Sequence, residues 1–286
     1  MTWKLDGGVA VVTGAGSGIG RALAHRLARE RMSLALADVD SAGLTETVEQ
    51  LGGASDSLSC HLVDVADRAR MERFAVEVVE QHGRLTLLMN IAGVAMHGTF
   101  EQLTIDEFDW LMKINFYGVL YGVANFLPVL RKQERAHIVN MSSIYGIIAP
   151  AGQTAYCASK FAVRGFTEAL LHELEGSTVG VSCVHPGGIR TPIARRAREG
   201  AKSDPKVRDV TLAMFDAVAV TSPEQVAARI VDGVKANEPR ILVGGDAVRL
   251  DRMQRLMPVR YWKLVVARGR RVMLGLAQRK AAGGGA

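Results

Sequence analysis

The sequence predicts an α/β protein in which a doubly wound parallel sheet of about seven strands carries helices on both faces. Short apolar runs rich in β-branched residues alternate with helical patterns along most of the chain, as in proteins built on a parallel sheet. A glycine-rich turn joins the first run to the first helical pattern, and an acidic residue ends the second run. The runs that we expect to form strands are 9–14, 34–38, 57–64, 85–90, 136–141, 179–184 and 240–244.

The first strand is expected to lead into a phosphate-binding turn. Val9 to Val12 are apolar, the segment TGAGSGIG follows at once, and the amphipathic stretch RALAHRLARER comes next. A strand, a glycine turn and a helix N-terminus present backbone N–H groups and the helix dipole to an anion. The spacing G-x-G-x-x-G is not met, whereas Gly14, Gly18 and Gly20 fit G-x-x-x-G-x-G. The alternative is that these glycines serve only a tight turn.

Asp38 indicates which ligand this turn holds. It ends the second apolar run, eighteen residues after Gly20, where an acid bonds the ribose hydroxyls of an adenine dinucleotide in a Rossmann-type fold. An acid there repels the additional phosphate of NADP. Val39 and Asp40 follow without a basic residue, and the turn carries Ser17 rather than Lys or Arg, so NAD is the expected cofactor. The alternative is that Asp38 is a turn residue at the end of a strand.

Tyr156 and Lys160 form the best candidate for a reacting centre. They are four residues apart in a run with a helical pattern, so they share one helix face, and Ser143 lies thirteen residues upstream of Tyr156. A free phenol has a pKa near ~10, and a neighbouring cation lowers that pKa towards the range useful for acid–base catalysis. A serine hydroxyl nearby can bond a substrate oxygen, so the trio suits the interconversion of an alcohol and a carbonyl. The alternative is an ordinary exposed helix turn.

Together these motifs resemble the short-chain dehydrogenase/reductase family, in the group with a TGxxxGxG loop and a YxxxK helix. The resemblance runs from about Lys4 to Gly244, and further motifs follow in the family's order. Asp64-Val65 is similar to the family's adenine contact, and Asn90 to Gly93 resembles its NNAG segment, with Ile91 in place of the second Asn. The remaining matches are Asn115, in the position of an Asn that holds a relay water, and Pro186 to Thr191, which resemble the PGxxxT segment that receives the nicotinamide carboxamide.

The resemblance implies a role for each of these residues. Tyr156 would be the general base in alcohol oxidation and the acid in carbonyl reduction. Lys160 would lower the pKa of Tyr156 and bind the nicotinamide ribose, and Asn115 would support the proton path. The catalytic residues implied are Tyr156, Lys160, Ser143 and Asn115, and the cofactor contacts are Gly14, Ser17, Gly18, Ile19, Gly20, Asp38, Asp64, Val65, Asn90, Ala92, Gly93, Tyr156, Lys160, Pro186, Gly187, Ile189 and Thr191.

Ser143, Tyr145 and Tyr156 are the expected substrate contacts. Ser142 competes with Ser143 for the catalytic role, but the thirteen-residue step to Tyr156 matches the family pattern and favours Ser143. If the segment is extended, the Ser142 side chain points to the other side of it. Tyr145 is expected to line the pocket.

The substrate walls are expected in three segments, 94–97, 147–151 and 192–222. In the family, the insertion corresponding to 192–222 forms a substrate lid, and the stretch from Leu212 to Val220 can cover an apolar substrate. These segments are mostly apolar, which hints at a lipophilic secondary alcohol, a steroid or a retinoid-like molecule. The lid begins with a basic run that we expect to be a solvated face. His97 either contacts a polar group of the substrate or is solvated.

Length and charge divide the chain into a catalytic domain, residues 1–248, and a basic, helical C-terminal extension, residues 249–286. The extension has ten Lys or Arg and one acid, a net +9 within a chain of net +6, so residues 1–248 carry −3. A helix starting near Val259 would gather basic residues on one side and the apolar residues, including a Tyr-Trp pair, on the other. We expect its apolar face to pack on the body or on a partner subunit of a homodimer or homotetramer. Peripheral contact with an anionic membrane is the alternative, and nucleic acid is not expected because no recognition motif accompanies the charge.

Other features narrow the class of protein. Three cysteines without a C-x-x-C motif or a Cys/His cluster predict buried, reduced thiols and no metal site. Neither a leader pattern nor an apolar run of spanning length is evident, so a cytoplasmic protein is expected. The sequence therefore predicts an NAD-dependent oxidoreductase that interconverts a secondary alcohol and a ketone, or a primary alcohol and an aldehyde. The alternatives are a cofactor-binding regulator without redox chemistry, a membrane-associated interaction protein, and epimerase or dehydratase chemistry on the same fold.

Overall fold

A computed structural model describes residues 3–53, 55–204 and 206–267. Its centre is a seven-stranded sheet with strand order β3-β2-β1-β4-β6-β7-β9, in which all neighbouring strands are parallel. The predicted fold class and all seven predicted strands are confirmed. The strands are β1 (Val9–Thr13), β2 (Ser33–Asp38), β3 (Leu58–Leu62), β4 (Leu87–Asn90), β6 (Ala136–Met141), β7 (Val179–Pro186) and β9 (Arg240–Val243).

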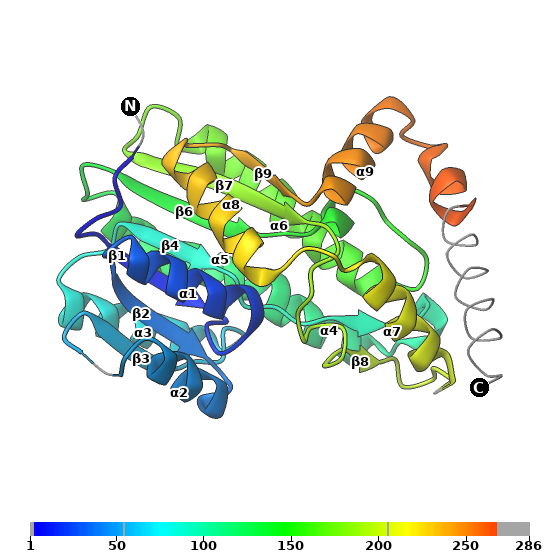
Figure 1. The fold of residues 1–286 in the computed structure, drawn as a ribbon, viewed down its shortest axis with the longest axis horizontal. Helices are drawn as coiled ribbons and strands as arrows, with labels where there is room; N and C mark the ends of the chain where they lie inside the picture. Colours follow the sequence, from blue (N-terminus) through cyan, green and yellow to red (C-terminus); the bar gives the residue numbers. More distant parts are fainter. Residues whose placement is uncertain (1–2, 54, 205, 268–286) are drawn as a thin grey trace, which may run out of the picture.

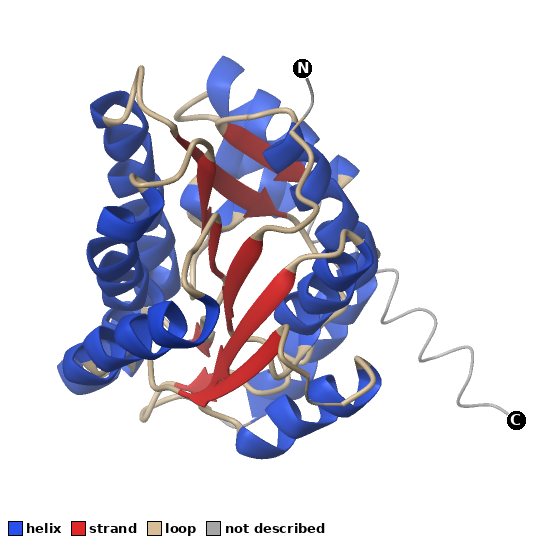
Figure 2. Ribbon diagram, turned by 90° about the vertical axis from the view of Figure 1, so that its left-hand side faces the viewer, coloured by secondary structure: helices blue, strands red, loops and turns tan. Residues whose placement is uncertain are grey.

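Helices cover both faces of this sheet (Figure 2). Strands β1, β4 and β6 are buried at every residue, which explains why they form unbroken apolar runs in the sequence. Side chains alternate between the two faces, so Val12 packs with one helix layer and Val11 with the other. One layer contains α1 (Gly18–Arg29), α2 (Ser41–Gln50) and α8 (Pro223–Lys235), and the other contains α3 (Arg68–His82), α5 (Gly118–Leu130) and α6 (Thr154–Glu173).

The remaining elements gather at one end of the molecule (Figure 1). They are α4 (Ile105–Met112), α7 (Lys206–Val218), α9 (Gly245–Leu256) and a small parallel sheet of β5 (Met96–His97) and β8 (Arg198–Glu199). Short 3-10 turns at 100–102 and 144–146 and a π-helical turn at 113–117 complete the described elements. The order of the main sheet reverses between β1 and β4, and ligands of such sheets bind beyond the carboxyl ends of the strands at this point.

The start of the C-terminal extension differs from the prediction. The boundary expected between residues 248 and 249 falls inside α9, so the extension begins as part of the folded body. Pro258 follows the end of α9, and the chain becomes helical again at 261–267. The predicted helix starting near Val259 is thus seen only in this short piece. Its residues Arg268, Arg270, Arg271, Val272, Met273 and Leu276, and the glycines Gly269 and Gly275, lie outside the described residues.

Two further expectations concern cysteines and membranes. Cys157 and Cys183 are buried free thiols as predicted, but Cys60 is exposed, because its side chain on β3 at the sheet edge faces outward. Within the described part of the chain, no helix is both long and apolar enough to cross a bilayer.

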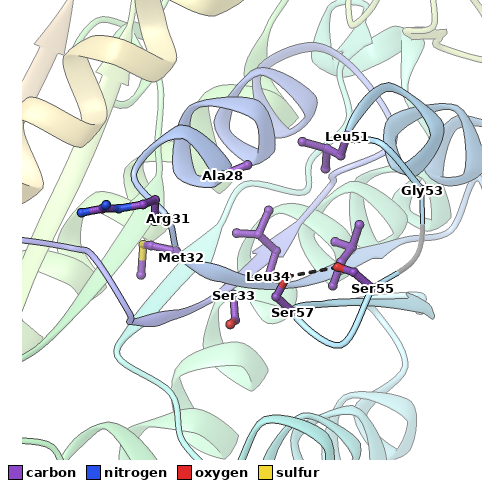
Figure 3. Close-up of a pocket in the computed structure, with 10 residues that line it drawn as sticks. Ala28, Arg31, Met32, Ser33, Leu34, Leu51, Gly53, Ser55 and Ser57 are labelled. Carbon is purple, nitrogen blue, oxygen red and sulfur yellow. Dashed lines mark hydrogen bonds between the residues drawn. The ribbon is translucent and has the colours of Figure 1, made fainter.

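Figure 3 shows a pocket of about 290 Å³ between the end of α1 and the starts of β2 and β3. It lies at the amino ends of these strands, opposite the edge where parallel sheets bind ligands. Its polar groups are serine hydroxyls, two of which bond each other (Ser55 and Ser57, Oγ to Oγ, 3.0 Å), and the Arg31 guanidinium, which is paired with Asp6. We assign no chemistry to this pocket.

Candidate active site

A single large cleft of about 2340 Å³ runs along the carboxyl ends of the strands. At one end it is lined by the glycine turn after β1 and by Asp38 at the end of β2. In the middle it is lined by Ser143, Tyr156 and Lys160, and at the other end by α7, α9 and residues 262–267. The structure therefore brings the predicted cofactor turn and the predicted reacting centre into one continuous space.

The glycine turn fits a dinucleotide because its backbone packs too closely to carry side chains. Gly14 and Gly18 have φ angles of +71° and +51°, the left-handed region that favours glycine. A β-carbon on Gly14 would lie 2.8 Å from Cα of Ala92, and one on Gly20 would overlap the carbonyl oxygen of Gly14. Helix α1 then begins at Gly18 with no acidic residue in its first turn, which leaves its N-terminal N–H groups and dipole for an anion.

Asp38 sits where the cofactor hypothesis requires an acid. Its Oδ2 accepts the backbone N–H of Gly16 at 2.8 Å, and its Oδ1 accepts the backbone N–H of Asp40 at 2.9 Å. The carboxylate is half-buried and lines the cleft, so these two bonds fix its position at the edge where a ribose would lie. Ser17, Ile19, Asp64, Val65, Ala92, Gly93, Pro186, Gly187, Ile189 and Thr191 also line the cleft, as predicted.

Asn90 is the exception among the predicted cofactor contacts. It is buried between β4 and β6, where its Nδ2 donates to Asn140 Oδ1 at 2.9 Å, and it does not line the cleft. A β-carbon on Gly122 would collide with the Asn90 amide, so α5 packs directly against it. The Asn90 side chain therefore supports the sheet beneath the site, and a contact between Asn90 and the cofactor stays a prediction.

Tyr156 lies in the first turn of α6, and Ser143 lies at the end of β6 facing it. A hydrogen bond from the Ser143 side chain acts on the Tyr156 phenol, and the Tyr145 ring meets the Tyr156 ring edge-on at 6.1 Å between centroids. Ser142 points away, because its Oγ donates to the carbonyl oxygen of Lys160 at 2.8 Å and is buried. The structure thus brings Ser143, rather than Ser142, to the phenol.

Lys160 is buried one turn further along α6. Its Nζ donates to the carbonyl oxygen of Met141 at 2.9 Å and lies 5.7 Å from the centroid of the Tyr156 ring. Burial lowers the pKa of Lys160 to about 8. Loss of water around the hydroxyl raises the pKa of Tyr156 to about 12, although the hydrogen bond from Ser143 works in the opposite direction. Contrary to the prediction, the pKa of Tyr156 is thus raised in the protein alone, because loss of water around the phenol outweighs the hydrogen bond from Ser143.

Asn115 is not among the residues that line the cleft, but its side chain bonds Val94, which does line it. It lies in the π-helical turn 113–117, a local irregularity of a kind often found at functional sites. Its Oδ1 accepts the N–H of Val94 at 2.8 Å, and its Nδ2 donates to the carbonyl of Val94 at 3.0 Å and to Ser159 Oγ at 3.1 Å. The fully buried side chain thus ties the loop at Val94 to α6, and its part in a water relay stays a prediction.

The expectation of a solvated basic face at the start of the lid is only partly correct. Arg195 and Arg196 are largely exposed, but Arg195 pairs with Asp216 at 2.9 Å and Arg196 approaches Asp40 at 3.5 Å. The guanidinium of Arg198 stacks on the Trp110 ring at 3.8 Å from its centroid. The contacts of Arg196 and Arg198 tie the lid to the body, whereas the Arg195–Asp216 pair lies within the lid.

Comparison with known proteins agrees with this geometry. The family model that describes short chain dehydrogenases matches residues 8–202. The chain belongs to the short-chain dehydrogenase family. The putative oxidoreductase SadH from Mycobacterium tuberculosis is 42% identical to this chain over 267 residues. The match covers 92% of this chain and 96% of SadH. The 3-oxoacyl-[acyl-carrier-protein] reductase FabG of Thermotoga maritima is 30% identical, covering 87% of this chain and 98% of FabG.

A solved short-chain dehydrogenase/reductase from Burkholderia phymatum, in complex with NAD, has a TM-score of 0.81 and 32% identity to this member of the family. It covers 88% of this chain and 94% of its own. Levodione reductase has a TM-score of 0.73 and 29% identity, with 84% of this chain and 98% of its own covered. The overall fold is therefore one that these solved relatives share.

The substrate end of this short-chain dehydrogenase contains a wall that sequence reasoning missed. Trp262 and residues 264–267 of the extension line the cleft, together with Arg249, Leu250 and Met253 of α9. The piece is anchored by Tyr261, whose hydroxyl accepts the N–H of Ala149 at 3.1 Å and whose ring packs on a buried cluster around Ile144 and Ile148. Of the alternatives for the tail, packing on the protein's own body holds for residues up to 267. The Tyr-Trp pair was the available signal, but it also fits a membrane surface.

Asp246 is a second residue that sequence reasoning missed. It lies in the first turn of α9, and its Oδ2 accepts the N–H of Gly188 at 2.7 Å. A β-carbon on Gly187 would collide with the same carboxylate. Asp246 therefore fixes the position of the segment from Pro186 to Thr191, which was predicted to receive the nicotinamide carboxamide. The only sequence signal for this contact is that Asp246 directly follows a Gly-Gly pair at the end of a strand.

The segments predicted to form the substrate walls do line the cleft, but not every residue in them does so. Val94, His97, Ile148, Ala151, Phe215 and Val218 line the cleft, whereas Met96 and Ile147 are buried in neighbouring apolar clusters and Leu212 is not among the lining residues. Among the described residues, no group of three metal-binding side chains is found.

Proposed function

We propose that this short-chain dehydrogenase is an NAD-dependent oxidoreductase that interconverts a secondary alcohol and a ketone, or a primary alcohol and an aldehyde. The observation that carries the proposal is the Tyr156 phenol, bonded by the Ser143 hydroxyl and with Lys160 Nζ 5.7 Å from its ring centroid, inside the cleft that also holds the glycine turn. A cofactor-binding regulator would not need this set of acid–base groups.

NAD, when bound, supplies the hydride acceptor for alcohol oxidation. Tyr156 takes the proton of the substrate hydroxyl in that direction and returns it to the carbonyl oxygen in reduction. Ser143 donates a hydrogen bond to the same oxygen and stabilises the charge that develops on it. Because the pKa of Tyr156 is raised to about 12 in the protein alone, the phenol needs additional positive charge nearby to act as a base near neutral pH.

The preference for NAD is supported by Asp38. Its carboxylate is held at the ribose end of the cleft by the N–H groups of Gly16 and Asp40, and a second acid, Asp40, lies beside it. Two carboxylates at this point repel a phosphate on the ribose. Two basic side chains lie near this point. Arg196 contacts Asp40, and Arg21 bonds Glu46 and the carbonyl oxygens of Gly16 and Gly43. The solved relative from Burkholderia phymatum was determined in complex with NAD.

An apolar substrate is supported by the composition of the far end of the cleft. Its lining includes the apolar side chains of Ile148, Met214, Phe215, Val218 and Trp262. Removing such surface from water on binding contributes about 25 cal/mol per Å². Relatives with carbonyl-reductase names, FabG and levodione reductase, are compatible with reduction as well as oxidation. Epimerase and dehydratase chemistry on this fold is the alternative within enzymes.

The test is a Tyr156→Phe variant assayed with a panel of apolar ketones and secondary alcohols by the absorbance of NADH. Loss of the phenolic proton should lower kcat by at least ~10³-fold, near the upper range for general acid–base catalysis. NADH binding, followed by protein-to-cofactor energy transfer, should change little, because the glycine turn is untouched. Turnover by the variant at a rate comparable to the wild type would refute the assignment. A wild-type protein that binds NADH but reduces no ketone would favour the regulator.

We also propose that the protein is a homodimer or homotetramer. The proposal is supported by two exposed aromatic side chains that a partner subunit could cover. Tyr117, just before α5, is 41% exposed, and Phe161 on α6 is 39% exposed. Light scattering coupled to gel filtration would check it, and a monomer at micromolar concentration would contradict it. Cytoplasmic localisation and membrane contact through the tail stay predictions.

A further inference from the structure

His97 presents a buried hydrogen-bond donor to the substrate end of the cleft. Its Nδ1 is 2.6 Å from Nε2 of Gln153. An amide nitrogen can only donate, so Nδ1 accepts and carries no proton. The proton of the neutral imidazole is then on Nε2, which is buried and has no hydrogen-bond partner among the described residues. His97 lines the cleft, as does Gln153.

The imidazole is neutral near pH 7. Burial lowers the pKa of His97, and of the charged groups that act on it, Glu199 raises that pKa and Arg208 lowers it. A neutral ring with an acceptor bond at Nδ1 has a single donor, Nε2–H. Leaving a buried donor unpaired is costly, and most buried polar groups in proteins have a partner. A hydrogen-bond acceptor on a bound ligand would give the unpaired Nε2–H its partner.

Gln153 connects this donor to the reacting centre. It is the residue before α6, three positions ahead of Tyr156, and its side chain makes no capping bond to the helix. The strand carrying His97 is also held to the same turn by the backbone, because the N–H of Gly98 donates to the carbonyl of Gly152 at 3.1 Å. The imidazole and the phenol are thus both fixed by the first turn of α6.

The surroundings of His97 limit what its partner can be. The cleft nearby is lined by Val94, Ala151 and the apolar residues of α7. A second buried hydroxyl without a partner, Ser203 Oγ, lines the cleft close to Gly98. Polar side chains of Gln102, Gln153 and Glu199 also line the cleft beside His97. A ligand that satisfies His97 and Ser203 therefore combines an apolar body with at least one oxygen at this point.

We propose that His97 binds a second oxygen of the substrate, so that the substrate is an apolar ketone or alcohol with a further hydroxyl, keto or ether oxygen that accepts the His97 Nε2–H. This proposal rests on the oxidoreductase function proposed above. His97 is then a residue that determines specificity, and Gln153 is a positioning residue that sets the tautomer of the imidazole.

The experiment uses ketone pairs that share a carbon skeleton, one with a single carbonyl and one with a second oxygen placed at successive ring positions. For at least one pair, the wild type should favour the oxygenated ketone, and His97→Phe should lower its kcat/KM by about 10- to 100-fold. The same variant should change kcat/KM for the plain ketone by less than about three-fold. His97→Gln, which keeps an N–H donor, should recover part of the loss.

The chain offers a matched control. His25 and Gln50 form another His–Gln pair, His25 Nε2 to Gln50 Oε1 at 3.1 Å, on the exposed surface. His25→Phe should leave both kcat/KM values within about two-fold of the wild type. Gln153→Leu should reduce the preference for the oxygenated ketone less than His97→Phe, because the ring keeps its proton on one of two nitrogens.

Two outcomes would overturn the proposal. One is that His97→Phe lowers kcat/KM equally for both members of every pair. The other is that the wild type does not distinguish the members of any pair. If no ketone is turned over at all, the oxidoreductase function fails, and the proposal on His97 is then decided by thermal-shift titrations of the NADH-loaded wild type and His97→Phe with the same pairs.

Discussion

The two ends of the cleft are built in different ways. The cofactor end is defined by backbone atoms of a short stretch, in which Gly14, Gly18 and Gly20 let β1, the turn and α1 approach closely. The substrate end is defined by side chains from segments far apart in the sequence, including β5, α7, α9 and residues 261–267. The contact between Tyr261 and Ala149 alone joins positions 112 residues apart.

This difference separates what is fixed from what can vary. Gly14 and Gly20 accept almost no substitution, because a β-carbon at either position meets backbone that cannot move away, whereas one on Gly18 meets the Thr191 side chain. A wall of side chains can be exchanged residue by residue while the sheet beneath it stays unchanged. Perturbations of the cofactor end should therefore affect every reaction of the protein, whereas perturbations of the substrate end should affect some substrates more than others.

The largest effect is expected from Gly20→Ala. The new methyl would overlap the carbonyl oxygen of Gly14, which is backbone held by β1, so the turn and α1 must move apart. We expect KM for NAD to rise by more than ~10-fold with every substrate, and the free energy of unfolding to fall by about 2–4 kcal/mol. Steady-state kinetics and urea unfolding measure these two quantities.

Gly165→Ala is the control for that variant. Gly165 is exposed in α6, and a β-carbon there meets nothing within 4 Å. The substitution should raise the free energy of unfolding by about 0.5–1 kcal/mol and leave KM for NAD unchanged. If Gly20→Ala behaved like Gly165→Ala, the idea that close backbone packing defines the cofactor end would have to be abandoned.

A smaller and more selective effect is expected from Trp262→Ala. The indole is half-buried and lines the substrate end, so its loss removes apolar surface that a bulky substrate would cover. We expect kcat/KM to fall by about ten-fold for large apolar ketones and by less for small ones, with KM for NAD unchanged. Kinetics across a series of ketones of increasing size measure this.

Trp3→Ala is the matched control, because Trp3 packs near His137 and Arg135 and is not among the residues that line the cleft. It should lower stability without changing the dependence of kcat/KM on substrate size. Equal losses for small and large ketones in Trp262→Ala would contradict a role for the extension in the substrate wall. Tyr261→Phe, which removes the bond to Ala149, should show the same size dependence more weakly.

The sequence was most informative where structure depends on local patterns. Strands β1, β4 and β6 were predictable because strands buried on both faces leave unbroken apolar runs, whereas the edge strands β3 and β9 alternate between buried and more exposed side chains. The glycine turn, Tyr156 and Lys160 were predictable because each depends on spacing within one element, and the family resemblance added Ser143. Two serines in a row were separated correctly because an extended chain directs neighbouring side chains to opposite sides.

The features that the sequence could not predict depend on three-dimensional surroundings. Asn90 was assigned to the cofactor by position in a motif, but whether its amide faces the cleft or Asn140 depends on how β4 and β6 pack. The wall formed by Trp262 depends on a contact with a distant turn, and no local pattern distinguishes it from a surface helix. The direction of the Tyr156 pKa failed because spacing predicts a neighbouring charge but not how much water surrounds both groups.

The smallest effect concerns Lys160 and is a change of stability with pH. In the folded protein Lys160 loses its proton near pH 8, whereas in the unfolded chain a lysine does so near ~10.4. Between these values the unfolded chain binds more protons, so the contribution of Lys160 to the free energy of unfolding rises with pH. From pH 8 to 9.5 we expect a rise of about 1–2 kcal/mol in the wild type relative to Lys160→Met.

Urea unfolding of both proteins at pH 7.5, 8.5 and 9.5 measures this difference. The comparison with Lys160→Met is needed because Cys157 and Cys183, whose pKa values burial raises to about 12, act in the opposite direction. Their thiols ionise more readily in the unfolded chain, so stability falls above about pH 8.5 in both proteins and cancels in the difference. A difference that stays flat or falls with pH would mean that Lys160 keeps its proton in the folded protein. The cation beside Tyr156 would then be present throughout this pH range. Burial would then lower the pKa of Lys160 less than expected.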